Sequence, residues 1–388
     1  MDELISIFKK HIKNGLYPGI EWKITHKEKI YKGTVGNLNL TSKEPLQPNS
    51  LYRIWSMTKP IVCIAILQLI QENKISIDDP INQYLPDFSN LKAIKDLNSN
   101  IFEVVDLKEM PTIKNLLLHT AGFSYNFLGD PVAKEYERVK LFHSSETTLE
   151  EEIHLLSKIP LLYQPSVKWI YSVSVDVLAR IIEIVSQNYL PTVLYNRIFK
   201  PLKMFDTGFN INNEDSARLM TSYEFDQLNN KLNEPLVGAQ KISGYGYPLN
   251  SLSYARGGHG LYSTVEDLDV PLVIHESTGD PNTAGGNRYG GMDLPESYLF
   301  HHIISHPFEQ MMAMMGMICG GVLERHPRLK VGFFEAGCSW VPYWLSRLDE
   351  HFEHPKLGHY MKDLTMKPSG YFERQCVVTC DPGDKTIP

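Results

Sequence analysis

The chain has 388 residues, of which 43% are hydrophobic and 21% charged, and its formal net charge is −7. This length suffices for two domains or for one large one, and the lack of a basic stripe argues against nucleic-acid binding. The longest apolar runs are about half a membrane span, and residues 1–15 lack the uninterrupted apolar core of a signal peptide. We therefore expect a soluble, cytoplasmic protein with no nucleic-acid partner and no membrane partner.

The first part of the chain shows three clear structural patterns. Residues 3–14 mix apolar and charged side chains as an amphipathic helix does, and residues 20–35 alternate as two strands joined by a turn at 27–29. Residues 57–74 are apolar almost all round, which is typical of a buried helix. From residue 75 to residue 250 we expect helices mixed with long loops.

The composition changes near residues 266–269, where lysine becomes rarer and histidine, methionine and glycine become more frequent. Beyond this point we expect strands at VPLVIHE, LKVGFFE and CVVTC, and helices over residues 296–325 and 343–352. An alternating order of strands and helices predicts a parallel α/β arrangement. Because no polar linker marks the change, we predict two abruptly joined domains, residues 1–266 and 267–388, as in a fusion.

A serine and a lysine three residues apart, Ser56 and Lys59, open the predicted buried helix. Residues at this spacing share one helix face, so the lysine amine can reach the serine hydroxyl. A lysine among apolar side chains is poorly solvated and can act as a base, while the helix N-terminus can stabilise an oxyanion. The spacing alone is weak evidence, because Lys9 and Lys92 also follow a serine by three residues.

Further segments place this motif in a family context. In chain order they are LYRIWSMTK, LLHTAG, QPSVKWIYSVSVDVLARIIE, PLKMFDT and GGHGLYST. In this order they resemble the motifs of the β-lactamase-related serine hydrolases, which include class C β-lactamases and the esterases built like them. The resemblance covers about residues 1–266. It implies a mixed α/β fold, a β-lactamase/penicillin-binding-protein-like α+β domain that here lacks its C-terminal strands.

The resemblance also implies roles for individual residues. Ser56 becomes the acylated nucleophile, Lys59 its activating partner, and Tyr171 the phenol that passes a proton to the leaving group. Three residues become candidates for substrate binding: Ser172, Gly258 and His259. His119 is expected to be a structural hydrogen-bonding residue, and no cofactor is expected.

Two departures from the family pattern bear on function. Where β-lactamases often carry Asn two residues after the tyrosine, this chain has Val173, which favours ester or small acyl substrates. The family's third motif, whose backbone N–H completes the oxyanion hole, is absent after residue 266, and losing one such donor costs on the order of 10²–10³ in rate. We expect poor turnover, and a sheet whose unpaired edge allows self-association.

The segment after residue 269 resembles a different family. VPLVIHESTG, PNTAGGNRYGG, GGVLERHPRLKVGFFEAG and WVPYWLSRLDEHFE are similar to parts of the metal-dependent amidohydrolases and decarboxylases. The resemblance implies a partial (β/α) TIM-barrel fragment, with His275 as a metal ligand and Glu335 as a substrate- or water-binding residue at the C-terminal ends of strands. A catalytic zinc wants about three protein ligands, so we expect no tightly bound metal. His302 and His306, four residues apart, are expected to be ordinary helix residues.

Three functions remain open at this point. The first is a serine hydrolase that acts on a small-molecule ester or amide through an acyl-enzyme on Ser56. The second is a metal-dependent amidohydrolase or decarboxylase activity of the C-terminal half, and the third is a catalytically inactive hybrid of two fold fragments. The retained serine motif and Tyr171 favour the first.

Overall fold

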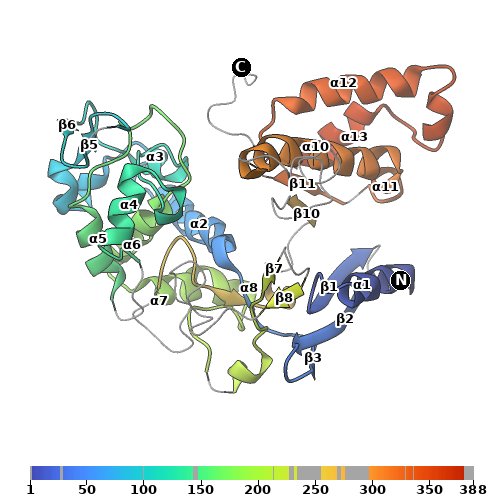
Figure 1. Ribbon diagram of the computed structural model, residues 1–388, viewed down its shortest axis with the longest axis horizontal. Coiled ribbons are helices and arrows are strands. Elements are labelled where there is room, and N and C mark those ends of the chain that lie inside the picture. The colour runs from blue at the N-terminus through green and yellow to red at the C-terminus, as the bar shows by residue number, and fades with distance from the viewer. Residues whose placement is uncertain are drawn as a thin grey trace. The chain divides into compact units, whose positions relative to one another are not determined.

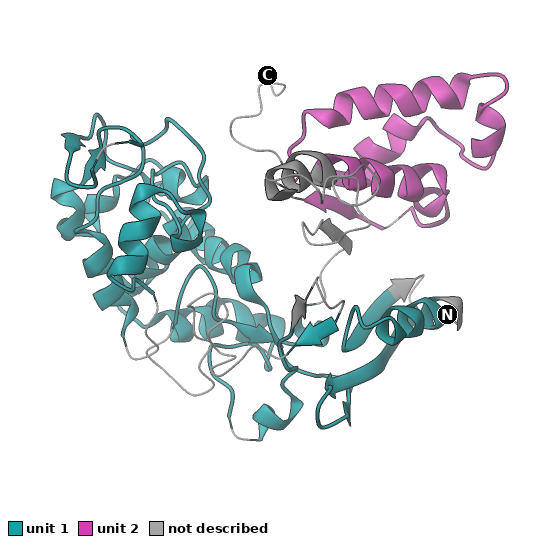
Figure 2. Cartoon of the chain, viewed as in Figure 1, with its two compact units in different colours: residues 1–269 teal, residues 270–388 magenta. Residues whose placement is uncertain are grey.

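The computed structural model describes residues 2–26, 29–98, 100–142, 147–212, 214–226, 231–233, 255–268, 272–275, 297–327, 329–334 and 336–379. The chain divides into two compact units, residues 1–269 and 270–388 (Figures 1 and 2). The assignment of two functional domains at residues 266 and 267 stays a prediction, because compactness alone does not identify a functional domain. No helix in the described part of the chain is both long and apolar enough to cross a membrane.

The first unit begins with one helix and an antiparallel sheet. The elements are α1 (Asp2–Lys13), β1 (Gly19–His26), β2 (Lys29–Asn39) and β3 (Glu44–Pro45), and the strand order is β1-β2-β3 (Figure 1). The predicted helix and the two predicted strands are confirmed, while Lys27 and Glu28 of the predicted turn lie outside the described residues. β1 is the outer strand of this sheet among the described residues, so self-association through its edge stays a prediction.

Aromatic packing joins α1 to the sheet. The ring of Phe8 on α1 lies 5.2 Å from the ring of Trp22 on β1, measured between centroids. Trp22 is paired with Gly33 across the sheet, and a Cβ at Gly33 would come within 2.3 Å of the indole. Glycine at this position therefore lets the indole lie flat across the neighbouring strand.

The hydrophobic core of the first unit is built around two helices, α2 (Thr58–Gln71) and α6 (Ser174–Ser186). Val62, Ala65 and Ile66 of α2 are completely buried, whereas Ile64 is 45% and Leu67 52% exposed, so the predicted helix is confirmed but it is buried on one side only. Other helices around this core are α3 (Ile113–Leu117), α4 (Pro131–Arg138), α5 (Leu149–Leu156), α7 (Leu190–Leu194) and α8 (Lys200–Leu202).

Short strands bring distant segments of the first unit together. β4 (Tyr52–Arg53) pairs with β9 (Tyr262–Ser263), which is followed by α9 (Val265–Leu268). This pairing sets residues 255–264 beside the start of α2, where the Ile54 N–H donates to the Leu261 carbonyl at 3.0 Å. The remaining hairpins are β5 (Lys92–Ile94) with β6 (Val104–Asp106), and β7 (Glu224–Asp226) with β8 (Lys231–Asn233).

The second unit contains a parallel sheet of order β10-β11-β12, formed by β10 (Leu272–His275), β11 (Val331–Phe334) and β12 (Cys376–Val378). Its helices are α10 (Ser297–Cys319), α11 (Val322–Arg325), α12 (Trp340–Glu353) and α13 (Pro368–Gln375). The predicted parallel α/β arrangement is therefore confirmed, and the methionine-rich run contributes Met314 to the core. Many α/β folds contain such a sheet, so this arrangement does not support the predicted TIM-barrel fragment.

Candidate active site

The serine motif lies at the start of α2. Ser56 belongs to a 3₁₀ turn (Trp55–Met57) that runs directly into this helix, and its side chain is exposed. Trp55 has a φ of +43°, a left-handed conformation that is a genuine outlier for so bulky a residue. Its ring stacks on His259 with centroids 6.3 Å apart. Strained backbone of this kind is often found at functional sites.

Lys59 is buried one turn further along and points back to the serine. Lys59 is only 8% exposed. Its Nζ donates to Ser56 Oγ at 3.1 Å and to the Gly258 carbonyl at 2.7 Å. Nζ also lies 4.6 Å from the ring centroid of Tyr171 and 5.3 Å from that of Tyr125. Two hydrogen bonds and two aromatic faces thus hold the amine in place.

Tyr171 completes this cluster, just before α6. Its hydroxyl donates to Ser56 Oγ at 2.7 Å, so the geometry expected from the motifs, with lysine and tyrosine both at the serine oxygen, is found. The Ile170 N–H donates to the His119 carbonyl at 2.9 Å, which anchors the segment that carries the tyrosine. Together these contacts form the arrangement that serine activation needs, a nucleophile within reach of two proton-transfer groups.

The three candidate substrate-binding residues have different surroundings. Ser172 is completely buried, and its hydroxyl bonds to His119 Nδ1 at 3.1 Å and to Ser174 Oγ at 2.8 Å. Gly258 contributes its carbonyl to Lys59, and His259 is 7% exposed and stacked on Trp55. Ser172 therefore faces the interior of the protein, while the other two line the lysine and the serine turn.

Two histidines beside the site are held in the neutral form. Burial, and next the charge of Lys59, lower the pKa of His119 to about 3. Burial, followed by the charges of Lys59 and Arg256, lowers the pKa of His259 to about 3. The Ser172 N–H donates to His119 Nδ1 at 3.2 Å, which supports the structural role expected for His119.

Sequence reasoning missed two residues that contact this cluster, Tyr125 and Asp176. Tyr125 is 4% exposed, and its ring lies 5.3 Å from that of Tyr171. Asp176 is 1% exposed on α6 and accepts the Gly258 N–H at 2.9 Å. A carboxylate inside the mostly apolar segment VSVDVLARII was the available signal, because buried acids are rare without a partner.

The predicted metal residues fall mostly outside the described structure. His275 ends β10, but its side chain, like those of His302 and His306 in α10, is not among those described, and Glu335 lies outside the described residues. Within the described ranges, no three His, Cys, Asp or Glu side chains gather to hold a metal ion. Metal binding through His275 stays a prediction.

Comparison with known families agrees with this geometry. A family model described as beta-lactamase matches residues 4–282, which is well over half of the chain. The chain belongs to the β-lactamase family. Among curated family relatives, the chain is 27% identical to esterase EstB of Burkholderia gladioli, over 63% of this chain and 61% of that protein. It is 29% identical to lovastatin esterase of Penicillium rubens, over 62% and 59% respectively.

The β-lactamase family fold is also seen in a solved structure, that of EstCE1, described as a hydrolase with promiscuous acyltransferase activity. It superposes with a TM-score of 0.57 at 24% identity, over 69% of this chain and 70% of the other. The chain spans less than two thirds of the length of the curated relatives it matches first. These comparisons support the β-lactamase-like part of the sequence prediction and give no support to an amidohydrolase-like segment or to a fusion.

Proposed function

We propose that the protein is a serine hydrolase that cleaves small esters through an acyl-enzyme on Ser56. The observation that carries this proposal is the convergence of Lys59 Nζ and Tyr171 Oη on Ser56 Oγ, at 3.1 and 2.7 Å. The exposed position of Ser56 leaves its oxygen open to a substrate carbonyl. The esterases among the relatives of this chain support the same class of reaction.

The reaction proceeds in two steps. Ser56 Oγ attacks the ester carbonyl while the Lys59 amine takes its proton, and the Ser56 N–H at the start of the helix stabilises the oxyanion. Tyr171 gives its proton to the departing alkoxide and regains one from Lys59, which leaves the acyl group on Ser56 and releases the alcohol. Water then attacks the acyl-enzyme with the same two groups as base and acid, which releases the carboxylic acid.

Val173 supports esters rather than β-lactams as substrates. Val173 is 1% exposed, and its backbone N–H donates to the Ser124 carbonyl at 3.2 Å. The side chain carries no hydrogen-bonding group, so it cannot bind the amide of an acyl chain as the family's asparagine does.

The absence of the third family motif from the sequence supports slow turnover. The second oxyanion donor of the family comes from a strand that returns to the N-terminal sheet, and β1 is the outer strand of that sheet in the described part of the chain. Removing one oxyanion donor costs on the order of 10²–10³ in rate. Both acylation of Ser56 and release of the acid pass through an oxyanion, so both steps are expected to be slow.

A fluorophosphonate probe tests the proposal directly, because it reacts with activated serines. The wild-type chain should be labelled on Ser56, and Ser56→Ala should abolish the label. Ser89→Ala is the matched control, since Ser89 is also an exposed serine three residues before a lysine; it should leave labelling unchanged. Labelling that persists in Ser56→Ala, or a wild-type chain that takes up no label, would contradict the proposal, and the latter result would favour an inactive hybrid.

A metal-dependent activity of residues 267–388 is the second candidate. The parallel order β10-β11-β12 is compatible with it, but many α/β folds have such a sheet, so this order does not favour it over the first candidate. A tight zinc site needs about three protein ligands, so elemental analysis of the purified chain is expected to find no stoichiometric metal. One zinc per chain that is lost in His275→Ala would establish this second candidate instead.

A further inference from the structure

Asp176 is connected to the candidate nucleophile through one glycine and one lysine. Its carboxylate accepts the Gly258 N–H at 2.9 Å, and the carbonyl of the same glycine accepts from Lys59 Nζ at 2.7 Å. Lys59 in turn reaches Ser56 Oγ at 3.1 Å. We infer that Asp176 is a positioning residue that fixes Gly258, and through it the Lys59 amine; this inference rests on the proposed function.

The fit between Asp176 and Gly258 is tight. A Cβ at Gly258 would lie 2.6 Å from Asp176 Oδ2 and 2.6 Å from Tyr125 Oη, and a Cβ at Gly257 would lie 2.1 Å from the Val175 carbonyl. The two glycines are therefore pressed against the first turn of α6, where Asp176 lies. A side chain at either position would move the Gly258 carbonyl away from Lys59.

Charged side chains also lie around the buried carboxyl of Asp176. Burial raises the pKa of Asp176, whereas the Gly258 N–H and the positive charges of Lys59 and Arg256 lower it. Arg256 is completely buried and pairs with Glu152 at 3.5 Å. Arg256 therefore has an acidic partner of its own, and the Asp176 carboxyl lies in the same buried region as Lys59, within range of its charge.

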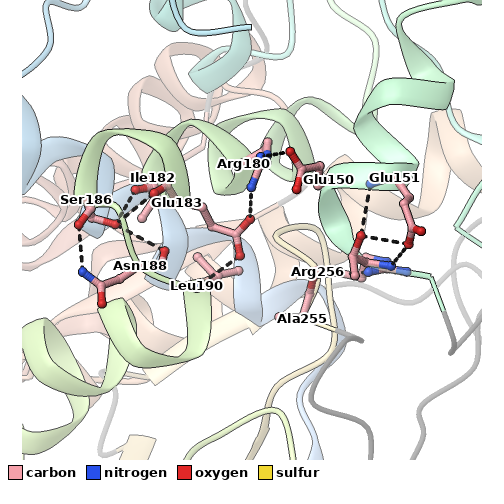
Figure 3. A network of polar contacts seen from close by, with 11 residues as sticks. Glu150, Glu151, Arg180, Ile182, Glu183, Ser186, Asn188, Leu190, Ala255 and Arg256 are labelled. Atoms are coloured by element: carbon pink, nitrogen blue, oxygen red, sulfur yellow. Dashed lines mark hydrogen bonds and ion pairs between the residues drawn. The ribbon is translucent and has the colours of Figure 1, made fainter.

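The same helix offers a matched control, Glu183. It is 8% exposed and accepts the Leu190 N–H at 3.0 Å, so it too is a buried carboxylate on α6 that holds a backbone N–H. Glu183 also forms an ion pair with Arg180 at 3.0 Å; the two side chains face each other in Figure 3. Both Asp176→Ala and Glu183→Ala remove a buried acceptor and should lower the melting temperature, but only the first lies next to Gly258.

The experiment measures the rate at which the fluorophosphonate probe labels Ser56, resolved into the limiting rate and the half-saturating probe concentration. Asp176→Ala should lower the limiting rate by about 10²-fold, because displacement of a catalytic group by about 1 Å has effects of this size. The half-saturating concentration should change by less than about twofold, since Asp176 does not touch the probe. Asp176→Asn keeps a neutral acceptor and should recover the rate to within about tenfold of the wild type.

The outcomes separate this inference from the proposed function. A wild-type chain that is not labelled on Ser56 overturns both. A labelled wild type with an unchanged rate in Asp176→Ala overturns the positioning role alone. An equal loss of rate in Glu183→Ala, or no recovery in Asp176→Asn, also overturns it, because the effect would then reflect general loss of structure. The predicted order of rates, wild type and Glu183→Ala above Asp176→Asn above Asp176→Ala, supports it.

Discussion

Two of the serine–lysine pairs with the same spacing in the first unit, Ser56–Lys59 and Ser89–Lys92, have very different surroundings. At the start of α2, Lys59 is 8% exposed and donates to Ser56. In the second pair, Ser89 lies in a 3₁₀ turn (Pro86–Asn90), while Lys92 begins β5 and forms an ion pair with Asp106. The Lys92 side chain is 45% exposed, so this lysine is an ordinary surface cation.

The difference lies in the backbone between the two residues and in what surrounds the lysine. A helical turn from Ser56 into α2 places the two side chains on one face, whereas a turn followed by a strand separates them. The apolar residues of α2 then force the Lys59 amine to find partners inside the protein, and it finds the serine, a carbonyl and two aromatic rings. The spacing of three residues brings a lysine amine to a serine hydroxyl only where both residues lie on one helical turn and the lysine is buried.

The largest expected effect comes from truncating the two lysines. Lys59→Ala should lower the rate of Ser56 labelling by about 10²–10⁴-fold, the usual contribution of a general base. Lys92→Ala loses a surface ion pair worth about 0–1 kcal/mol and should leave the rate unchanged. Labelling rates of the two variants measured side by side decide the matter. Equal rates would show that the burial of Lys59 has no catalytic meaning.

The second effect concerns release of the acyl group. With p-nitrophenyl acetate, we expect a burst of about one p-nitrophenol per chain, followed by turnover about 10²–10³-fold below the median enzyme rate of about 10 s⁻¹. The burst should disappear in Ser56→Ala and remain in Ser89→Ala. Rapid-mixing absorbance measurements detect both phases. A steady Ser56-dependent rate near the median without a burst would show that the oxyanion hole is complete.

The smallest effect is on stability against acid. Burial, then Lys59, lowers the folded-state pKa of His119 to about 3 from an ordinary value of 6.5. Between these values the unfolded chain binds a proton that the folded chain does not, so the free energy of unfolding falls as pH falls, by up to about 1.4 kcal/mol per pH unit. His259, whose pKa is also lowered to about 3, contributes a similar pH dependence to the free energy of unfolding.

His119→Asn tests this dependence without disturbing the backbone. His119 has a φ of +54°, and asparagine tolerates the left-handed region better than most residues do. Urea unfolding between pH 6 and pH 4 should give a slope smaller by about 1.4 kcal/mol per pH unit in the variant. Identical slopes for the variant and the wild type would mean that His119 is protonated in the folded chain.

Local patterns in the sequence predicted the elements well. The apolar run after Lys59 predicted α2, the alternation before residue 35 predicted β1 and β2, and three short apolar segments predicted β10, β11 and β12. Ser56, Lys59 and Tyr171 were found from their order in the chain together with the motifs around them. These features depend on residues close in sequence or on a pattern repeated along the chain, and both are readable without a structure.

Contacts between distant segments could not be predicted in the same way. The local sequence near Asp176 does not indicate a hydrogen bond to Gly258. Likewise, Tyr52–Arg53 does not indicate strand pairing with Tyr262–Ser263. The local sequence also gave no sign that the Ser172 hydroxyl bonds to His119, 53 residues away along the chain. Such partners depend on tertiary packing, which overrides what neighbours in sequence suggest.

The bond from Lys59 to the Gly258 carbonyl has a consequence for folding. It closes a loop of 199 residues, and the bond from Tyr171 to Ser56 closes one of 115. Loops of this length form late, since their closure entropy must be overcome before the contact stabilises anything. During refolding from urea, helical signal from α2 should therefore return before Ser56 becomes reactive. The reactivity of Ser56 during refolding therefore reports when segments distant in the sequence of the first unit have come into contact.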